Sequence, residues 1–250
     1  MTTDGQPSGR RTDWNAWHHD YTEAGSPLAR RLEIIRPEIR RVFAAADARS
    51  AGGRSEPLTV LSACAGDGRD ILEILAERHR RGEHRPEPRS SGAAGAVPQP
   101  PPVTIEVTLI ETDPRNLERA ALFCRHEGLT GVRLRDCDAG LAGSYLGAVP
   151  ADLVLMCGVF GNLADPDVRR LVEFLPRLCG VGATLIWTRT RRPPDLTPTL
   201  RNWLAAAGFT ELSFTAPPNV QFAVGVHRFD AQPLPLPGTL ADQRLFSFVR

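Results

Sequence analysis

The sequence predicts an α/β protein built on a doubly wound, mostly parallel sheet of seven strands. Short apolar segments, typical of buried strands, alternate with segments whose apolar residues recur every three or four positions, as on one face of a helix. The alternation ends in two adjacent strands, which favours a hairpin-like edge on an otherwise parallel sheet. The length of 250 residues and the hydrophobic content of 42% are enough for one such domain with extensions.

The N-terminal part is expected to lie outside the sheet. Residues 1–12 are polar and lack the apolar run of a signal peptide, so we expect a disordered tail. Residues 13–56 are predicted to form a helical lid, because an aromatic group precedes a helix from Pro27 to about Ala48 with apolar residues on one face. Pro37 should kink or divide that helix. The aromatic group consists of Trp14, Trp17 and Tyr21, with His18 and His19 between them.

Residues 57–230 are predicted to form the main domain, and residues 231–250 a C-terminal extension. A stretch at about 79–102, rich in Arg, Gly, Ser, Ala and Pro, buries too little apolar surface to order itself, so we expect a disordered surface insertion. Strands are expected at 58–61, 105–110, 132–134, 151–156, 183–188, 211–214 and 221–228. Helices are expected from 71 onward and over 114–126, 165–178 and 196–207, the last ended by Gly208 as a C-cap.

Composition excludes several classes of function. The formal net charge of +1 argues against a partner held mainly by phosphate electrostatics. All 30 of the Lys and Arg residues are arginine, so the sequence contains neither a Schiff-base lysine nor a P-loop lysine. The 5 cysteines form no Cys-x-x-Cys pair, which favours buried free thiols in a reducing, cytoplasmic compartment over a disulfide framework or a metal site. No apolar run approaches the roughly 20 residues that cross a membrane.

The turn after the first strand is the first candidate site. The apolar segment 58–61 runs into Ser-Ala-Cys-Ala-Gly-Asp-Gly-Arg-Asp, residues 62–70, and then into a helix. Gly66 and Gly68 allow the backbone to approach a ligand closely, and the helix offers free N–H groups and the positive end of its dipole. A Gly-x-Gly pair also occurs by chance in ordinary turns, so it indicates a nucleotide-type site only together with other residues.

Two acidic residues follow the next strands. Glu111 ends the second strand beside the glycine turn, where a carboxylate can hold both hydroxyls of a ribose. Asp113 is expected to cap the next helix, which Pro114 begins. Asp138 follows the third strand and can accept a hydrogen bond from an adenine amino group. Ligands of such sheets bind beyond the carboxyl ends of the strands, so these sites should lie together. The alternatives are a solvated loop acid at Glu111 and a turn-capping acid at Asp138.

These residues resemble the motifs of class I S-adenosylmethionine-dependent methyltransferases over about residues 58–228. The first motif, a strand with an acid and then Gly-x-Gly-x-Gly, is matched by 60–70, the second by 109–114, the third by Asp138-Ala139, the fourth by 151–163, and the turn into the fifth strand by 179–185. The resemblance implies a Rossmann-like methyltransferase fold and S-adenosylmethionine as cofactor. The cofactor-binding residues that it implies are Ser62, Ala63, Cys64, Gly66, Asp67, Gly68, Glu111, Thr112, Asp138, Ala139, Cys157 and Gly158.

Two positions depart from the family pattern. Ser62 stands where the family usually has an acid, which removes a partner for the methionine amino group or its bound water. Cys64 stands in place of the first glycine, and in this form the turn resembles that of a subgroup of uncharacterised bacterial methyltransferases. We expect Trp17 and Tyr21 of the lid to cover cofactor or substrate, with Tyr21 contacting the cofactor. The alternative is that these aromatic side chains simply pack the lid onto the sheet.

The expected reaction is methyl transfer to a small-molecule acceptor, bound between the lid and the loops after the fourth and fifth strands. Arg189, Arg191 and Arg192 either form a solvated loop or hold an acidic group of the acceptor. Nucleic-acid methylation is not expected, because the sequence has no Asn-Pro-Pro-aromatic tetrapeptide after the fourth strand and no basic stripe. No membrane partner is expected either. No catalytic residue is assigned; the candidates for a base or positioning group are His18, His19, Tyr21, Asn162 and Arg189.

Two other functions remain open. A dinucleotide-dependent oxidoreductase is disfavoured, because Ile71 stands where the third glycine of its turn would be. A non-catalytic S-adenosylmethionine-binding or regulatory protein would retain the same fold, and the departures at Ser62 and Cys64 keep that alternative open.

Overall fold

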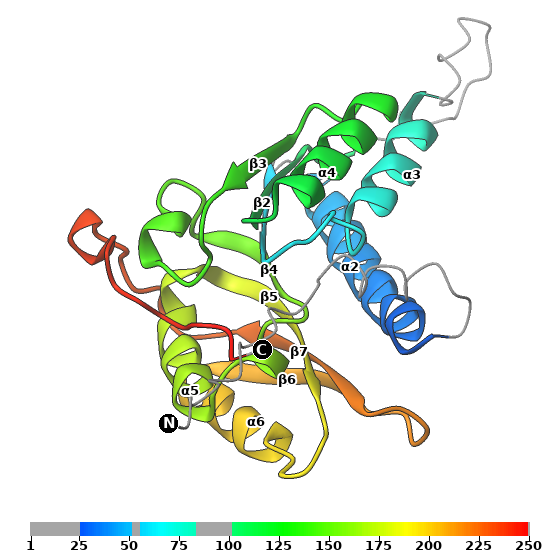
Figure 1. Cartoon of the computed structure of the whole chain (residues 1–250). Coiled ribbons are helices and arrows are strands. Elements are labelled where there is room, and N and C mark those ends of the chain that lie inside the picture. Colours follow the sequence, from blue (N-terminus) through cyan, green and yellow to red (C-terminus); the bar gives the residue numbers. More distant parts are fainter. Residues whose placement is uncertain (1–25, 52–55, 84–101, 250) are drawn as a thin grey trace, which may run out of the picture.

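A computed structural model describes residues 26–51, 56–83 and 102–249 of the chain (Figure 1). Their centre is a 7-stranded sheet with the strand order β3-β2-β1-β4-β5-β7-β6. Neighbouring strands are parallel except for β7, which runs antiparallel to both β5 and β6. The predicted mostly parallel sheet is therefore confirmed. The strands are β1 (Leu58–Ala63), β2 (Ile105–Glu111), β3 (Val132–Asp136), β4 (Ala151–Met156), β5 (Cys179–Thr190), β6 (Phe209–Thr215) and β7 (Phe222–Phe229).

Helices cover both faces of the sheet and make a three-layer molecule (Figure 1). On one face lie α2 (Pro27–Ala51), α3 (Leu72–Glu83) and α4 (Pro114–His126). On the other lie α5 (Asp165–Phe174) and α6 (Thr197–Ala206). The short 3-10 helices are η1 (Ala142–Tyr145), η2 (Phe160–Asn162), η3 (Leu175–Arg177) and η4 (Gly238–Leu240). In the part of the chain that the structure describes, no helix combines the length and apolarity needed to cross a membrane.

Local sequence signals explain where several elements begin. Asp113 caps α4, because its carboxylate accepts the Arg115 backbone N–H at 2.9 Å and Pro114 occupies the first turn, as predicted. Gly208 ends the α6 region with a φ of +91°, a left-handed conformation that glycine adopts without strain. The expected long helix after Asp165 instead ends at Phe174 and continues as the 3-10 turn η3, whose second residue is Pro176.

The long N-terminal helix differs from its predicted form. Pro37 does not divide α2, and its side chain lies on the exposed side of the helix. The opposite side carries Ile35, Ile39 and Phe43, all 3% exposed or less, and it packs with residues of β1, β4 and β7. Residues 27–51 of the expected lid therefore form a layer on the sheet face, where the apolar side of the helix is buried. The remainder of the expected lid up to residue 25, with its aromatic group and Tyr21, lies outside the described residues, as does the tail 1–12.

The segment expected as a disordered insertion overlaps the end of α3. Residues 79–83 belong to α3 and not to a disordered segment, while 84–101 lie outside the described residues. Contacts explain the longer helix: Arg78 forms an ion pair with Asp47 of α2 at 2.6 Å, and Arg80 forms one with Glu127 after α4. Both pairs bind α3 to its neighbours where the composition alone indicated no order.

The segment expected as a C-terminal extension packs on the main domain. Leu245 and Phe246 are 0% and 2% exposed. Single β-bridges join Leu141 to Arg244 and Leu163 to Phe248. Residues 241–249 therefore pass over the ends of the strands instead of trailing into solvent.

Gly225 of β7 faces Trp187 of β5 across the antiparallel ladder. A Cβ atom at position 225 would lie 2.2 Å from Cε2 of Trp187, which is fully buried against the ring of Phe160. Because the indole has no room to move, we expect Gly225→Ala to lower the free energy of unfolding by about 1–3 kcal/mol in urea denaturation. Gly238→Ala is the matched control, since no heavy atom lies within 4 Å of its Cβ position. Equal stabilities of the two variants would contradict this packing.

His227 of β7 predicts a pH dependence of stability. Its side chain is 1% exposed, and its Nδ1 accepts the Trp187 Nε1–H at 3.2 Å. Desolvation lowers its pKa from 6.5 to about 4, although Glu211 opposes the shift. The unfolded chain therefore binds a proton that the folded chain does not, so stability is full above pH 6.5 and falls as the pH decreases toward 4. Between pH 7 and 5 this loss should be about 2 kcal/mol.

The variant His227→Gln keeps an acceptor for Trp187 and removes the titrating ring. Urea denaturation at pH 7 and pH 5 measures the free energy of unfolding of this variant and of the natural chain. The loss of stability between the two pH values should be about 2 kcal/mol smaller in the variant. A pH dependence identical in both proteins would assign the effect to other groups.

Candidate functional site

The turn between β1 and α3 has an unusual backbone. Cys64, Gly66 and Gly68 have φ values of 53°, 58° and 77°, all in the left-handed region. The turn is closed by hydrogen bonds from the Gly68 N–H to the Ala65 carbonyl at 3.0 Å and from the Ala65 N–H to the Ile110 carbonyl at 2.9 Å. A left-handed conformation is unusual for a residue with a side chain, so Cys64 is held in place by its surroundings.

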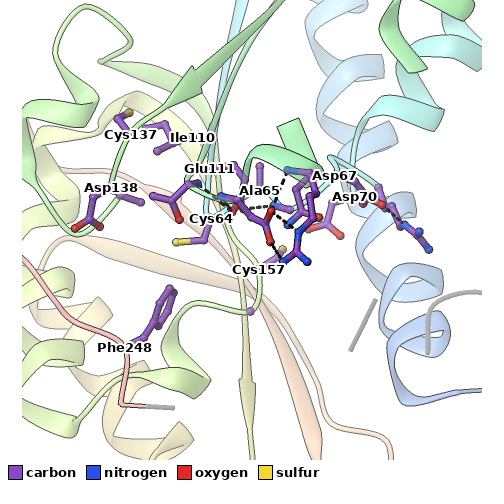
Figure 2. Close-up of a pocket in the computed structure, with 18 of the residues that line it drawn as sticks. Cys64, Ala65, Asp67, Asp70, Ile110, Glu111, Cys137, Asp138, Cys157 and Phe248 are labelled. Carbon is purple, nitrogen blue, oxygen red and sulfur yellow. Dashed lines mark hydrogen bonds and ion pairs between the residues drawn. The ribbon is translucent and has the colours of Figure 1, made fainter. Parts of the chain in front are cut away.

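Glu111 connects this turn to the end of β2. Its Oε2 accepts the Gly66 backbone N–H at 2.8 Å, and its Oε1 accepts the N–H groups of Thr112 at 3.0 Å and Asp113 at 2.8 Å. Figure 2 shows Glu111 beside the turn residues Cys64 and Ala65. Each carboxylate oxygen can accept more than one hydrogen bond, so Glu111 can both hold the turn and accept hydroxyl groups.

A cavity of about 780 Å³ opens at this edge of the sheet. The ends of β1, β2, β3 and β4 form its walls, as the parallel topology requires. Most of the residues expected at a cofactor site line it: Cys64, Gly66, Asp67, Glu111, Thr112, Asp138, Ala139, Cys157 and Gly158. Ser62 and Ala63 are buried inside β1. Gly68 packs against α3, and a Cβ atom added at this position would lie only 2.7 Å from Cδ1 of Leu72. Tyr21 lies outside the described residues.

The C-terminal segment supplies cavity residues that the sequence reasoning missed. Arg244, Phe246 and Phe248 line the cavity, and Figure 2 shows Phe248 on the side away from Glu111. Arg244 forms an ion pair with Asp138 at 2.5 Å, and the other Asp138 oxygen accepts the Gly140 N–H at 2.7 Å. The only sequence signal was the apolar run that contains Leu245, Phe246 and Phe248 near the end of the chain.

The first turns of α2 also reach the site. Arg31 is 6% exposed and lines the cavity, with its Nη1 3.6 Å from the position that a Cβ of Gly158 would take. Arg36 donates a hydrogen bond to the Arg69 carbonyl at 2.9 Å, which joins α2 to the glycine turn. Sequence reasoning missed Arg31, because a single charged residue among the apolar positions of a helix does not reveal which partner it meets.

Burial disfavours the thiolate forms of Cys64 and Cys157 on the cavity wall. Desolvation raises the pKa of Cys64 well above its usual range, and the carboxylates of Glu111 and Asp138 raise it further. Desolvation raises the pKa of Cys157 in the same way, with Asp70 adding to the effect. None of the 5 cysteines forms a disulfide, and all of them lie in the described residues. The described residues also contain no cluster of three or more His, Cys, Asp or Glu that could hold a metal ion.

Two further candidates for a base or positioning group, Asn162 and Arg189, form hydrogen bonds within the loop after β4. Asn162 donates a hydrogen bond from Nδ2 to the Gly158 carbonyl at 2.6 Å. Arg189 donates to the Phe160 carbonyl and pairs with Asp165 at 3.3 Å. Both side chains shape the loop between the fourth strand and α5, next to the cavity. The candidates His18 and His19 lie outside the described residues.

Comparison with known proteins shows the fold. No protein family and no protein of curated function matches the sequence. The CurJ carbon methyltransferase superposes with a TM-score of 0.60 at 13% identity, over 88% of this chain and 59% of its own. Magnesium protoporphyrin IX methyltransferase (ChlM) from Synechocystis PCC 6803, with bound SAM, superposes with a TM-score of 0.53 at 13% identity, over 87% of this chain and 91% of its own. An O-methyltransferase family protein from Burkholderia thailandensis superposes with a TM-score of 0.53 at 14% identity, over 80% of this chain and 57% of its own. The chain therefore has the fold of these methyltransferases.

The C-terminal segment predicts two separable mutant effects. Phe246 is 2% exposed, whereas Phe248 is 41% exposed and lines the cavity. We expect Phe246→Ala to lower the free energy of unfolding by about 3 kcal/mol or more, because it removes a buried ring. Phe248→Ala should cost less than about 1 kcal/mol. Urea denaturation of both variants tests the difference, and a loss that is equally small in both would show that the segment is not part of the folded core.

Proposed function

We propose that this chain is a methyltransferase that binds S-adenosylmethionine in the 780 Å³ cavity and methylates a small molecule. The observation that carries the proposal is the left-handed turn at Cys64, Gly66 and Gly68, held against the Glu111 carboxylate at the centre of a parallel sheet. Such a crevice beyond the carboxyl ends of the strands is where open α/β sheets bind nucleotide ligands.

The residues of the cavity fit this cofactor in size and polarity. Its volume lies within the roughly 300–1,000 Å³ of small-molecule sites. Gly66 lacks a Cβ atom, so the nucleoside can approach the backbone, and Glu111 offers acceptors for the ribose hydroxyls. The Oδ1 atom of Asn116, on the cavity wall, is buried without a hydrogen-bond partner in the described structure. A buried acceptor of this kind is suited to a donor group of the ligand.

The methionine end of the cofactor would lie toward α2. Arg31 is a buried cation on the cavity wall and is suited to the carboxylate of that end. Asp70 lines the same wall, and its carboxylate lies close enough to Cys157 to help raise the pKa of that thiol. A carboxylate is therefore present near the loop after β4. We assign Asp70 the role of partner for the amino group, in place of the acid that Ser62 replaces.

Bound S-adenosylmethionine supplies an electrophilic methyl group, to which a lone pair of the acceptor forms a bond as the sulfur–carbon bond breaks and the acceptor's proton passes to solvent. The chain contributes mainly by positioning. Gly66 and Glu111 orient the nucleoside, and Arg31 and Asp70 orient the amino-acid end. Gly158, with a φ of +78°, lies on the cavity wall without a side chain and would leave room there for the acceptor to approach the methyl group. Alignment of two reactants in this way accounts for a large part of such rate enhancements.

Calorimetry on the full chain tests the proposal directly. S-adenosylhomocysteine should bind with a dissociation constant of about 1 μM or less, which corresponds to about −8 kcal/mol. NAD, the cofactor of the main competing class, should give no heat of binding at the same concentrations. Binding of NAD without binding of S-adenosylhomocysteine would overturn the proposal.

Glu111→Ala should weaken the binding of S-adenosylhomocysteine by about 1.5–3 kcal/mol, the scale of a lost hydrogen bond to a charged group. Glu106→Ala is a matched control on the same strand, because Glu106 lies near the opposite end of β2 and pairs only loosely with Arg133 at 3.4 Å. Calorimetry measures the affinities, and thermal melting confirms that both variants fold. Unchanged affinity in a folded Glu111→Ala variant would place the ribose elsewhere.

A further inference from the structure

A second cavity of about 490 Å³ adjoins the first. It lies between the first turn of α2, the loop after β4, the carboxyl end of β5 and the segment that precedes β7. Arg31 and Gly158 line both cavities. A molecule in the second cavity therefore reaches the first at Gly158, where the proposed cofactor presents its reacting end.

The second cavity is cationic. Arg31, Arg189 and Arg192 are among its lining residues, and no Asp or Glu of the described chain is. Arg192 donates from Nε to the amide oxygen of Gln221 at 3.1 Å, and no carboxylate of the described residues lies within ion-pair distance of it. Arg192 thus adds positive charge to the wall that no carboxylate of the described residues neutralises.

Arg189 adds a buried donor that no described group accepts. Its side chain is 9% exposed, and its Nε atom is buried without a hydrogen-bond partner in the described structure. Its carboxylate partner, Asp165, is 54% exposed, lies at 3.3 Å and does not line the cavity. Desolvation lowers the pKa of Arg189, so burial of this cation is costly without a closer anion. Buried donors of this kind normally have partners.

Two further features favour an anion in the same place. Pro27 and Leu28, the first residues of the 25-residue helix α2, line the cavity, so the positive end of a long helix dipole points toward it. Asn219 and Gln221 bring amide groups that can donate to an anion. Phe222 supplies apolar surface beside them, suited to a ligand with an apolar body.

We propose that this second cavity binds the methyl acceptor and that the acceptor carries an anionic group, a carboxylate or a phosphate, held by Arg189 and Arg192. The assignment rests on the proposed methyl transfer and adds to it the chemical class of the substrate. Arginine suits this task, because its planar donors match the oxygens of either group. The methyl-accepting atom then lies toward Gly158, and the anionic group lies toward the end of β5.

The test uses the full chain and three simple probes of similar size: benzoate, phenyl phosphate and the neutral benzyl alcohol. Each is titrated by calorimetry with and without saturating S-adenosylhomocysteine. We expect at least one of the anions to bind about tenfold or more tightly than benzyl alcohol, with an affinity that falls as salt is added. The tighter anion identifies whether the acceptor group is a carboxylate or a phosphate.

Arg192→Gln should weaken the binding of the preferred anion by about tenfold or more and leave the affinity for S-adenosylhomocysteine unchanged. Arg192→Lys keeps the charge and should retain part of the affinity. Arg169→Gln, on the exposed side of α5, is the control that removes one arginine elsewhere. Arg192 is used because Arg189 also braces the loop after β4, so its loss would confound binding with folding.

Equal binding of benzyl alcohol and the anions, or an unchanged anion affinity in the Arg192→Gln variant, would overturn the assignment of the acceptor. Absence of anion binding to a chain that does bind S-adenosylhomocysteine would overturn it as well. Anion binding to a chain that does not bind S-adenosylhomocysteine would instead overturn the proposed methyl transfer and leave the anion site standing.

Discussion

The parallel register of the central strands is the constraint on which the site depends. Ser62 of β1 pairs with Leu109 of β2 and with Leu155 of β4, so these three strands end at the same edge. The chain proceeds from β1 to one side of the sheet and later returns to place β4 on the other side of β1. The loops after β1 and β4 therefore diverge and leave a crevice between them. The glycine turn, Glu111, Gly158 and the two cavities all lie along this edge.

The backbone of the glycine turn holds a residue with a side chain in a left-handed conformation. A left-handed conformation costs a residue with a Cβ atom about 1–2 kcal/mol, and Cys64 adopts it. Neighbouring hydrogen bonds hold it there, since Ala65 is bonded to Ile110 and Gly66 to Glu111. Ser62 is 4% exposed within β1 and does not line the cavity. Position 62 therefore belongs to the interior of the sheet and not to the wall of the cavity.

The two cavities differ in charge although they share a wall. The larger one mixes carboxylates such as Glu111 and Asp138 with arginines, including the Arg244 that neutralises Asp138. The smaller one is lined by arginines and uncharged residues among the described part of the chain. Gly158 stands between them, its N–H donating to Thr188 Oγ1 at 2.8 Å. A cation-bearing cofactor and an anionic acceptor would therefore each meet complementary charge, in separate compartments that open on one another.

The sequence by itself determined the α/β class, the strands to within a few residues, and the clustering of Cys64, Gly66, Glu111 and Asp138 at one edge. Those features follow from periodicity and from parallel topology, which act over short stretches of chain. It did not determine that α2 packs flat on the sheet, that Arg31 reaches Gly158, or that residues 241–249 close the cavity. Only the tertiary structure decided these contacts, because they join segments that are well separated along the chain, and no local propensity encodes which distant surface a buried side chain will meet.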